Sequence, residues 1–275
     1  MNAAFSLSDQ DVDLILEDVH ELYGYDFTNY SRASLKRRLT RLITTECFLS
    51  FAEFRYRVRQ DREYFKRFVE EITVNVTEMF RDTHFYRTLR EEVLPVLATS
   101  PLIRIWHAGC STGEEVYSMA ILLKEANLLH KSLLYATDIN PSVLEKVRRG
   151  MFPMNQMKQY SENYILSGGR EDFSRYYTAQ YSSAKFDEEL GEKIVLATHN
   201  LVSDGSFNEF HLILCRNVLI YFDKPLQDRV LKLFHDSLQM LGFLGLGAKE
   251  TLRFTEVFKN FKQIKPKEKI WRKTA

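Results

Sequence analysis

The 275-residue sequence has few features of membrane-spanning, secreted or metal-binding proteins. No apolar run reaches the roughly 18 residues that a membrane-spanning helix needs. Cys47, Cys110 and Cys215 are far apart and form no CxxC pair, which argues against a disulfide framework and a structural zinc site. The seven histidines show no HExxH or comparable spacing. The N-terminus turns acidic at once and lacks a signal-peptide pattern, so we expect a cytoplasmic protein.

The net charge of +1 conceals a strongly basic segment. Between Arg32 and Arg67 there are eleven Lys or Arg against four Asp or Glu, a local net charge of +7 that leaves −6 for the rest of the chain. Such asymmetry indicates an acidic partner. The alternative is that these side chains only form the solvated faces of several helices, and the pattern favours neither interpretation.

Residues 1–75 are predicted to form a small basic domain of helices. Ser8 can cap a first helix with apolar residues at helical spacing, and Gly24 fits its end. Ser31 can open a second helix that has leucines on one face and basic residues on the other. Two shorter helical patterns follow, SFAEFRYRVRQ and REYFKRFVEEI.

From residue 76 to 275 the pattern becomes one of strands that alternate with helices. After a helical stretch around FYRTLREEVLPVL, strands are predicted at LIRIWHA, LLYATD, KIVLATHN, HLILCRN and GFLGLG. Helices are predicted at EVYSMAILLKEA, PSVLEKVRR and PLQDRVLKLFHDSLQML, and QIKPKEKIWRK is predicted as an edge strand. This alternation favours an α/β fold with a parallel sheet wrapped by helices. Residues 151–192 lack a clear crossover helix, and we interpret them as an inserted small β-subdomain.

The stretch HAGCSTGEEVYS, residues 107–118, lies between a predicted strand and a helix, where open α/β sheets bind ligands. Its small residues, Gly109 among them, let the backbone approach a ligand. No lysine follows Gly113, which excludes a P-loop, and Glu114 and Glu115 would repel a pyrophosphate at the helix start. The helix dipole explains one acidic residue there. The pair favours a ligand with an amine or a sulfonium.

Asp138 ends the strand LLYATD, about 25 residues beyond the glycines, where a carboxylate can accept hydrogen bonds from a ribose diol. It can instead serve only to cap the helix that begins at Pro141. A nucleoside with a cationic, zwitterionic tail describes S-adenosylmethionine. The loop and Asp138 together therefore predict a methyltransferase.

Several motifs resemble the CheR family of chemotaxis receptor glutamate methyltransferases. They are NVTEMFRD, IWHAGCSTGEEVYSMA, ATDINPSVLEKVRRGMF, HNL and CRNVLIYFDK, in the order and spacing of that family, and YDFTNYSRASLKRRLTRLI is similar to its basic N-terminal domain. The resemblance covers nearly the whole chain. It implies a Rossmann-like class I S-adenosylmethionine-dependent methyltransferase sheet, with a helical N-terminal domain and an inserted β-subdomain. It also implies methyl transfer to glutamate carboxylates of chemoreceptors, with S-adenosylhomocysteine as product and no metal.

The resemblance also assigns site residues. Arg81 and Tyr221 are implied at the reacting end, where we expect them to orient groups rather than exchange protons. Glu115 is implied as the cofactor contact, whereas Glu114 suits a helix start. With Gly109 of the loop, the predicted cofactor-binding residues are Asn75, Thr77, Arg81, Gly109, Glu115, Asp138, Asn200, Leu201, Asn217 and Val218. For each of these residues a structural role in the core or in a helix cap is the alternative.

Three positions depart from the family pattern. His211 stands in place of an acidic residue before the LILCRN strand, Lys249 in place of a serine, and Val116 in place of a proline. None of these residues is assigned to the cofactor. If these three departures affect the protein, we expect the effect on the shape of the opening where the substrate enters.

The implied partners are Glu- and Gln-rich cytoplasmic helices of transmembrane receptors, which suit a basic domain. Arg37, Arg38 and Arg41 are candidate docking residues unless they form internal salt bridges. Some family members bind a receptor tether by strand addition at the β-subdomain. Two other functions stay open: a nucleic-acid methyltransferase, although no [DNS]PP[YFW] element or Pro-Cys nucleophile is present, and a scaffold that binds cofactor without turnover.

Overall fold

A computed structural model describes residues 7–73 and 77–275. The chain divides into two compact units, one of Met1–Val74 with Ile220–Arg229 and one of Asn75–Leu219 with Val230–Ala275. Among the helices of the described ranges, none has both the length and the apolar character that crossing a bilayer requires.

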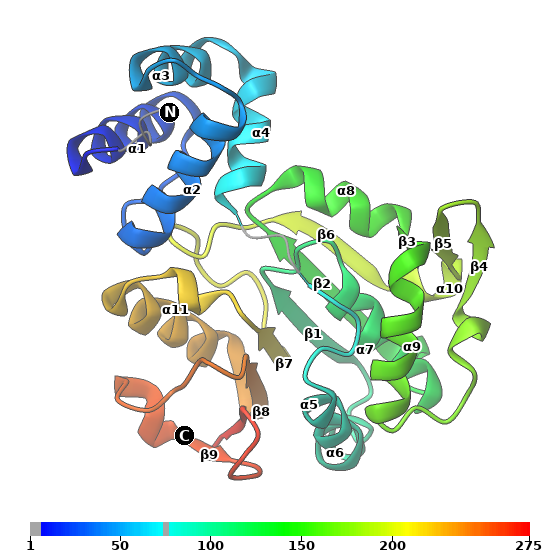
Figure 1. The fold of residues 1–275 in the computed structure, drawn as a ribbon. Coiled ribbons are helices and arrows are strands. Elements are labelled where there is room, and N and C mark those ends of the chain that lie inside the picture. Colours follow the sequence, from blue (N-terminus) through cyan, green and yellow to red (C-terminus); the bar gives the residue numbers. More distant parts are fainter. Residues whose placement is uncertain (1–6, 74–76) are drawn as a thin grey trace. The chain divides into compact units, whose positions relative to one another are not determined.

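The first unit is helical, as the sequence predicts. Ser8 caps the first helix by accepting a hydrogen bond from the Asp11 N–H, and Gly24 ends it in the left-handed conformation, with φ of 75°. Apolar residues at helical spacing form the core of this unit, with Val12, Leu39 and Phe68 fully buried. Its first four helices are α1 (Asp9–Tyr23), α2 (Arg32–Thr45), α3 (Phe51–Gln60) and α4 (Arg62–Ile72) (Figure 1).

Residues 220–229 pack with this helical unit although they are distant in sequence. The Ser31 N–H donates to the Tyr221 carbonyl at 2.7 Å, and the Asp223 N–H donates to the Asn29 carbonyl at 2.9 Å. The Tyr30 and Phe222 rings contact edge-to-face at 5.0 Å between centroids. The boundaries between the two units therefore fall within the short helix η5 (Leu219–Tyr221) and within α11 (Lys224–Ser237), whose first residues, up to Arg229, belong to the helical unit.

The second unit contains a seven-stranded sheet in the order β6-β2-β1-β7-β8-β10-β9. The five strands from β6 to β8 are parallel to one another, whereas β10 and β9 pair antiparallel. The strand order reverses at β1, which lies between β2 and β7, and such a switch point is where α/β sheets bind ligands. The strands are β1 (Ile103–Ala108), β2 (Ser132–Asp138), β6 (Ile194–Thr198), β7 (Phe210–Cys215), β8 (Leu238–Leu246), β9 (Phe261–Gln263) and β10 (Ile270–Lys273).

The helices of this unit alternate with its strands. They are α5 (Thr83–Thr88), the π-helix η1 (Leu89–Val93), α6 (Leu94–Leu97), α7 (Glu114–Glu125), η2 (Leu129–Lys131), α8 (Pro141–Arg149), η3 (Met154–Gln156), α9 (Met157–Leu166), η4 (Phe173–Tyr176), α10 (Glu188–Gly191) and η6 (Glu256–Asn260). All six residues of β7 are buried, as expected of a central parallel strand with both faces covered.

The sequence prediction fails at two boundaries near the C-terminus. The helix predicted to run through QML ends at Ser237, and Leu238 begins β8, because this segment pairs with β7 and β10. QIKPKEKIWRK is not one edge strand: β9 and β10 form a hairpin in which only β9 lies at the edge of the sheet.

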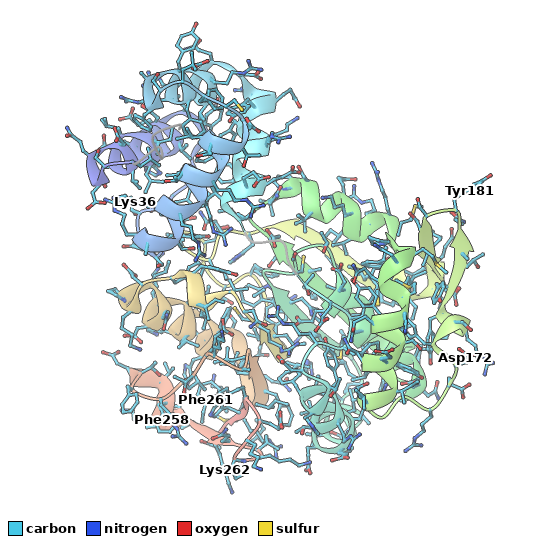
Figure 2. All side chains as sticks on the ribbon, viewed as in Figure 1. Lys36, Asp172, Tyr181, Phe258, Phe261 and Lys262 are labelled. Carbon is cyan, nitrogen blue, oxygen red and sulfur yellow. The ribbon has the colours of Figure 1, made fainter. Side chains whose placement is uncertain are left out.

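The insertion contains a three-stranded antiparallel sheet, as expected, in the order β3-β5-β4. Its strands are β3 (Met151–Pro153), β4 (Tyr177–Gln180) and β5 (Ser183–Phe186). Tyr181, at the turn between β4 and β5, is fully exposed and points away from the protein (Figure 2). The ten-residue helix α9 also lies in this segment, where the sequence pattern shows no clear helix.

Candidate active site

The predicted cofactor residues of the second unit gather where the parallel strands end. Ala108 of β1 is paired with Thr137 of β2, and His107 of β1 with Leu214 of β7, so the carboxyl ends of these strands are level. Gly109 follows β1, Asp138 ends β2, Asn200 and Leu201 follow β6, and Asn217 and Val218 follow β7. Asn75 lies outside the described residues, and Thr77 is half-buried.

Gly109 makes a turn that strongly favours glycine. Its φ is +74°, in the left-handed region, and a Cβ built on it would lie 2.6 Å from Val218 Cγ2. The N–H groups of Gly109 and Cys110 both donate to the Thr137 carbonyl at 2.9 Å. The glycine therefore lets the loops after β1 and β7 meet at the end of β2.

Asp138 is a buried carboxylate held by backbone donors. Its Oδ2 accepts from the Ser111 N–H at 2.9 Å and its Oδ1 from the Asn140 N–H at 3.0 Å. Burial raises the pKa of Asp138 above its ordinary value. Each oxygen keeps a lone pair for a hydroxyl donor. Asn140, not Asp138, caps α8 by accepting from the Ser142 N–H at 2.9 Å, so the capping role suggested for Asp138 belongs to its neighbour.

Glu115 is bonded within the protein. Its Oε1 lies 2.9 Å from His107 Nδ1, and its Oε2 accepts from Arg216 Nη1 at 3.3 Å. Burial acts to raise the pKa of Glu115, but the bond from His107 and the charge of Arg216 together hold it below its ordinary value. Glu115 is thus a carboxylate that joins the end of β1 to the end of β7.

Glu114 is also buried, and it contacts the insertion. Its Oε2 accepts from the Thr112 hydroxyl at 2.5 Å, and the Tyr160 hydroxyl of α9 donates to its Oε1 at 3.4 Å. Burial raises the pKa of Glu114. The sequence interpretation, a residue suited only to a helix start, misses this contact.

Arg216 is a site residue that the sequence analysis does not single out. Its guanidinium donates to the Arg81 carbonyl at 2.8 Å and to Asp82 Oδ2 at 2.7 Å. It also lies 4.2 Å from the centroid of the Phe85 ring. The available signal was a cation directly after the apolar run LILC, since a buried charge needs partners.

The segment around Arg81 is held in an unusual backbone conformation. Phe80 and Asp82, on either side of it, have φ of 55° and 60°. The Phe80 N–H donates to the Ser118 hydroxyl of α7 at 3.0 Å, and Asn163 Nδ2 of α9 donates to the Met79 carbonyl at 3.0 Å. Three separate elements, counting Arg216 after β7, therefore position this segment.

The loop after β6 is closed by its own side chains, and the loop after β8 is bonded to the loop after β7. Asn200 Oδ1 accepts from the Val202 N–H at 3.0 Å, and the Asn200 N–H donates to Asp204 Oδ2 at 2.8 Å. Asn217, with φ of 62°, donates its N–H to Glu250 Oε2 at 3.0 Å. Lys249 precedes Glu250 in the turn after β8, close in sequence to this contact.

His211 lies away from the carboxyl edge. It is the second residue of β7, and its Nδ1 accepts from the Arg104 N–H at 3.1 Å. Four residues separate it from the end of the strand at Cys215, about 13 Å at strand geometry. This departure from the family pattern therefore lies away from the edge of the sheet where the predicted cofactor residues gather.

The buried thiols are not poised as nucleophiles. Burial raises the pKa of Cys110 and of Cys215 well above the ordinary value, so both stay protonated near neutral pH. Within the described ranges there is no group of three or more His, Cys, Asp or Glu that could hold a metal ion.

In the first unit, the arginines of α2 differ in their contacts. Arg38 Nη1 donates to the Glu71 and Ile72 carbonyls at 3.4 and 3.3 Å, and its guanidinium lies 5.3 Å from the centroid of the Tyr221 ring. Arg37 and Arg41 are exposed and have no acidic partner in the part of the chain that the structure describes. Other basic residues pair with acids: Arg32 with Asp13, Lys36 with Asp9, Arg55 and Arg59 with Asp18, Arg57 with Asp61, Lys66 with Glu63, and Arg67 with Glu46.

A carboxylate at the end of β2 beside a glycine turn at the end of β1 is the arrangement expected of a nucleoside-binding α/β protein. The family model described as "CheR methyltransferase, SAM binding domain" matches residues 75–267, so the second unit is that of an S-adenosylmethionine-dependent methyltransferase. A second model, "CheR methyltransferase, all-alpha domain", matches residues 10–73. The chain belongs to the CheR methyltransferase family.

Relatives of similar length support this assignment. The chain is 46% identical over 267 residues to a Pseudomonas putida protein named as a methyltransferase, Cher3, with 97% of this chain and 98% of the relative covered. It is 32% identical to chemotaxis protein methyltransferase 2 of Pseudomonas aeruginosa, covering 84% and 82% of the two chains. It is 31% identical to the chemotaxis protein methyltransferase of Listeria innocua, covering 83% and 85%.

The carboxyl edge fits the adenosyl cofactor on three observations. Gly109 leaves backbone room that a Cβ would fill. The Asp138 carboxylate retains lone pairs for two ribose hydroxyls. The buried Ser111 hydroxyl has no hydrogen-bond partner among the described residues, so it is free to bond a ligand.

Proposed function

We propose that the protein transfers the methyl group of S-adenosylmethionine to glutamate side-chain carboxylates on cytoplasmic helices of chemoreceptors. Its relatives in Pseudomonas aeruginosa and Listeria innocua carry the name chemotaxis protein methyltransferase. One observation supports a carboxylate as the methyl acceptor. The glutamates and the thiol of the loop after β1 are already hydrogen-bonded or protonated, so none of them is available as a general base. Glu115 is bonded to His107 and Arg216, Glu114 is bonded to Thr112, and the Cys110 thiol is protonated.

A site without an available general base suits a methyl acceptor that does not have to lose a proton. A glutamate with an ordinary pKa of about 4.3 is already an anion at neutral pH, whereas an amine or hydroxyl acceptor must lose a proton. The cofactor supplies a methyl group activated by its sulfonium. The protein then has to hold the carboxylate oxygen in line with that methyl group and exclude water.

We assign the cofactor contacts as the family resemblance implies. The proposed set is Asn75, Thr77, Arg81, Gly109, Glu115, Asp138, Asn200, Leu201, Asn217 and Val218. Asp138 holds the ribose hydroxyls, and Gly109 admits the backbone close to the ligand. Because Glu115 is bonded to His107 and Arg216, its proposed contribution is a fixed negative charge for the cationic tail. Arg81 and Tyr221 are proposed to orient the reacting groups.

The test uses methyl-labelled S-adenosylmethionine and membranes that carry the organism's chemoreceptors. We expect label on receptor protein that alkali releases as methanol, because carboxyl methyl esters are base-labile. Membranes without receptors are the control. Base-stable label on lysine or nucleic acid would identify another methyltransferase class, and cofactor binding without any turnover would identify a scaffold.

A further inference from the structure

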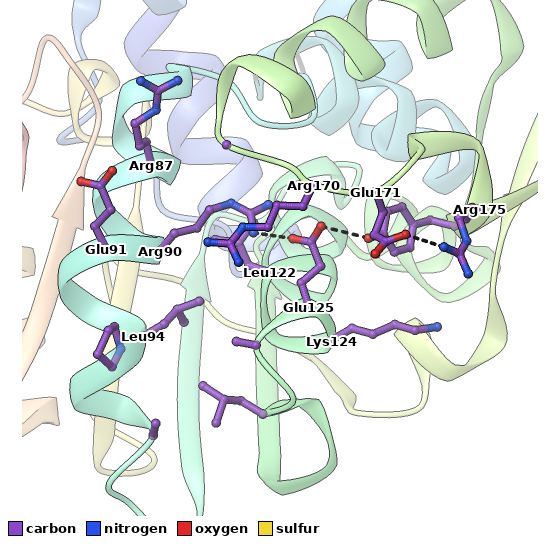
Figure 3. Close-up of a pocket in the computed structure, with 16 residues that line it drawn as sticks. Arg87, Arg90, Glu91, Leu94, Leu122, Lys124, Glu125, Arg170, Glu171 and Arg175 are labelled. Carbon is purple, nitrogen blue, oxygen red and sulfur yellow. Dashed lines mark hydrogen bonds and ion pairs between the residues drawn. The ribbon is translucent and has the colours of Figure 1, made fainter.

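The second unit contains a surface pocket of about 920 Å³ that is separate from the carboxyl edge of the sheet. It lies between the helical stretch of α5 to α6, the C-terminal end of α7, and residues 168–176 of the insertion (Figure 3). The cofactor loop meets α7 at Glu114, whereas the pocket meets this helix from Leu122 onward. Eight residues of helix separate the two positions by about 12 Å.

The acidic residues of this pocket are already neutralised by cations. Glu91 pairs with Lys265 at 2.8 Å, Glu125 pairs with Arg90, and Glu171 pairs with Arg175. The Tyr164 and Tyr176 hydroxyls also donate to Glu125. The acids therefore leave little negative charge to repel an anion.

Two of the basic residues of the pocket are not neutralised by a salt bridge. Arg87 and Arg170 line the pocket, are exposed, and form no salt bridge within residues 7–73 and 77–275; the charge of Arg87 contributes, after Lys265, to lowering the pKa of Glu91. Arg87 uses one N–H to donate to the Leu166 carbonyl at 2.8 Å, which leaves further donors of its guanidinium available. The fifth cation of the pocket, Lys124, pairs with Glu189 at 2.7 Å.

Arg90 and Arg170 point toward one another across the pocket (Figure 3). The Arg90 side chain is only 16% exposed, and its Nε and Nη2 have no hydrogen-bond partner among the described residues. Two guanidinium groups that approach each other where water is partly excluded repel, and an anion between them removes this repulsion. A small movement of the exposed Arg170 side chain, with the anion bound between the two guanidinium groups, would also give the buried donors of Arg90 an acceptor.

The remainder of the pocket wall is apolar. Leu94, Pro95 and Leu128 line it, with Tyr176 at the insertion side. The size falls within the range of pockets that hold small molecules. A ligand for this pocket therefore combines an anionic end with an apolar body.

We propose that this pocket binds a small organic phosphate with an aromatic or apolar body, its phosphate held between Arg90 and Arg170, with the charge of Arg87 at the edge of the pocket (Figure 3). Planar guanidinium groups match the charge and geometry of a phosphate dianion better than those of a single carboxylate. The proposal does not depend on which acceptor the enzyme methylates.

The test is calorimetric titration of the full chain with phenyl phosphate. Saturating S-adenosylhomocysteine is present so that the cofactor site is occupied and cannot bind the phosphate. We expect saturable binding that is weakened about tenfold or more in Arg170→Ala, the loss of one charge-assisted hydrogen bond, and by a smaller factor in Arg87→Ala, which removes a charge at the edge of the pocket. Arg149→Ala, which removes an exposed arginine of α8 outside the pocket, is the matched control and should bind as the wild type does.

Three results would overturn the proposal. One is the absence of saturable binding up to about 10 mM phenyl phosphate, beyond the millimolar affinity of a weak ligand. Another is binding to both pocket variants as tight as to Arg149→Ala, with circular dichroism showing all three folded. The third is benzoate binding more tightly than phenyl phosphate, which would make this a carboxylate site.

Discussion

Single residues at the carboxyl edge of the sheet determine whether the loops after β1 and β7 can pack together. Gly109 has the tightest contact between these loops. Gly109→Ala places a Cβ 2.6 Å from Val218 Cγ2 at a φ of +74°. We expect a loss of about 1–3 kcal/mol in stability and at least a tenfold loss of cofactor affinity. Denaturant unfolding and calorimetry with S-adenosylmethionine measure both.

The control for this substitution is Gly205→Ala, where an added Cβ meets nothing within 4 Å. The double variant Gly109→Ala, Val218→Ala removes the clash and should recover part of the stability, while the backbone strain persists. Wild-type cofactor affinity in Gly109→Ala would show that this turn does not approach the ligand.

Glu114 gives a pH-dependent prediction. Burial raises the pKa of its carboxyl in the folded state above the ordinary 4.5, so the folded state binds the proton more tightly than the unfolded chain. Its contribution to stability is present at low pH and declines as the pH rises through the folded pKa. Glu114→Gln removes the charge and keeps one acceptor oxygen, and its amide NH2 can donate to the other hydroxyl of the Thr112 and Tyr160 pair. The Tm of this variant relative to wild type should therefore be higher at pH 7 than at pH 4, and a difference that grows on acidification would contradict the assignment.

Tyr221 tests whether the proposed reaction needs proton transfer. If this residue orients groups and a carboxylate attacks as an anion, Tyr221→Phe should lower kcat about tenfold to a hundredfold but leave a measurable rate with an unchanged pH profile. Total loss of activity with an altered profile, in a variant that still binds cofactor, would indicate a general acid or base instead.

At the scale of elements, helix α9 positions the segment that carries Arg81. Asn163 donates to the Met79 carbonyl, and the Tyr164 ring of the same helix contacts Phe80 at 5.3 Å between centroids. Asn163→Leu keeps the side-chain shape but leaves that carbonyl unpaired, at a cost of about 1–3 kcal/mol. We expect the KM for S-adenosylmethionine to rise several-fold and hydrogen exchange to increase at residues 79–82.

Lys158→Leu is the matched control for this helix, because Lys158 is exposed on α9. It should leave both measurements unchanged. A lower Tm in Asn163→Leu with the KM unaltered would mean that the contact stabilises the fold without positioning the segment.

At the scale of the whole molecule, the charge asymmetry is the basis of the proposed docking of an acidic receptor helix. The contacts of the α2 arginines indicate which of them are available for it. Arg38 is engaged by backbone carbonyls and Tyr221, whereas Arg37 and Arg41 present unneutralised charge. Arg37→Glu with Arg41→Glu should raise the KM for receptor about fivefold or more at low salt, and less at high salt, because exposed charges are screened.

Cofactor affinity should not change in this variant. Arg62→Glu with Arg149→Glu makes the same total charge change at exposed positions of α4 and α8, and it is the control for a general effect of net charge. Equal KM values for receptor in all three proteins at physiological salt would exclude docking through Arg37 and Arg41.

The amino-acid sequence by itself determined the features that depend on near neighbours. Ser8 and Gly24 bound a helix through local hydrogen bonds, and the apolar run of β7 implies a strand covered on both faces. The glycine turn and Asp138 lie at strand ends because the strand pattern places them there. The family motifs also depend on order and spacing, which are properties of the sequence.

Only the tertiary structure decided the features that depend on distant partners. Asp18 pairs with Arg55 and Arg59, which lie 37 and 41 residues away, so much of the apparent positive charge is neutralised within the unit. Arg216 donates hydrogen bonds to Arg81 and Asp82, which lie more than 130 residues earlier in the sequence. Pairing with β7 and β10 extends β8 back to Leu238, into residues that have helical spacing. Local propensity carries too little free energy to outweigh such pairing, so the sequence pattern alone could not reveal these outcomes.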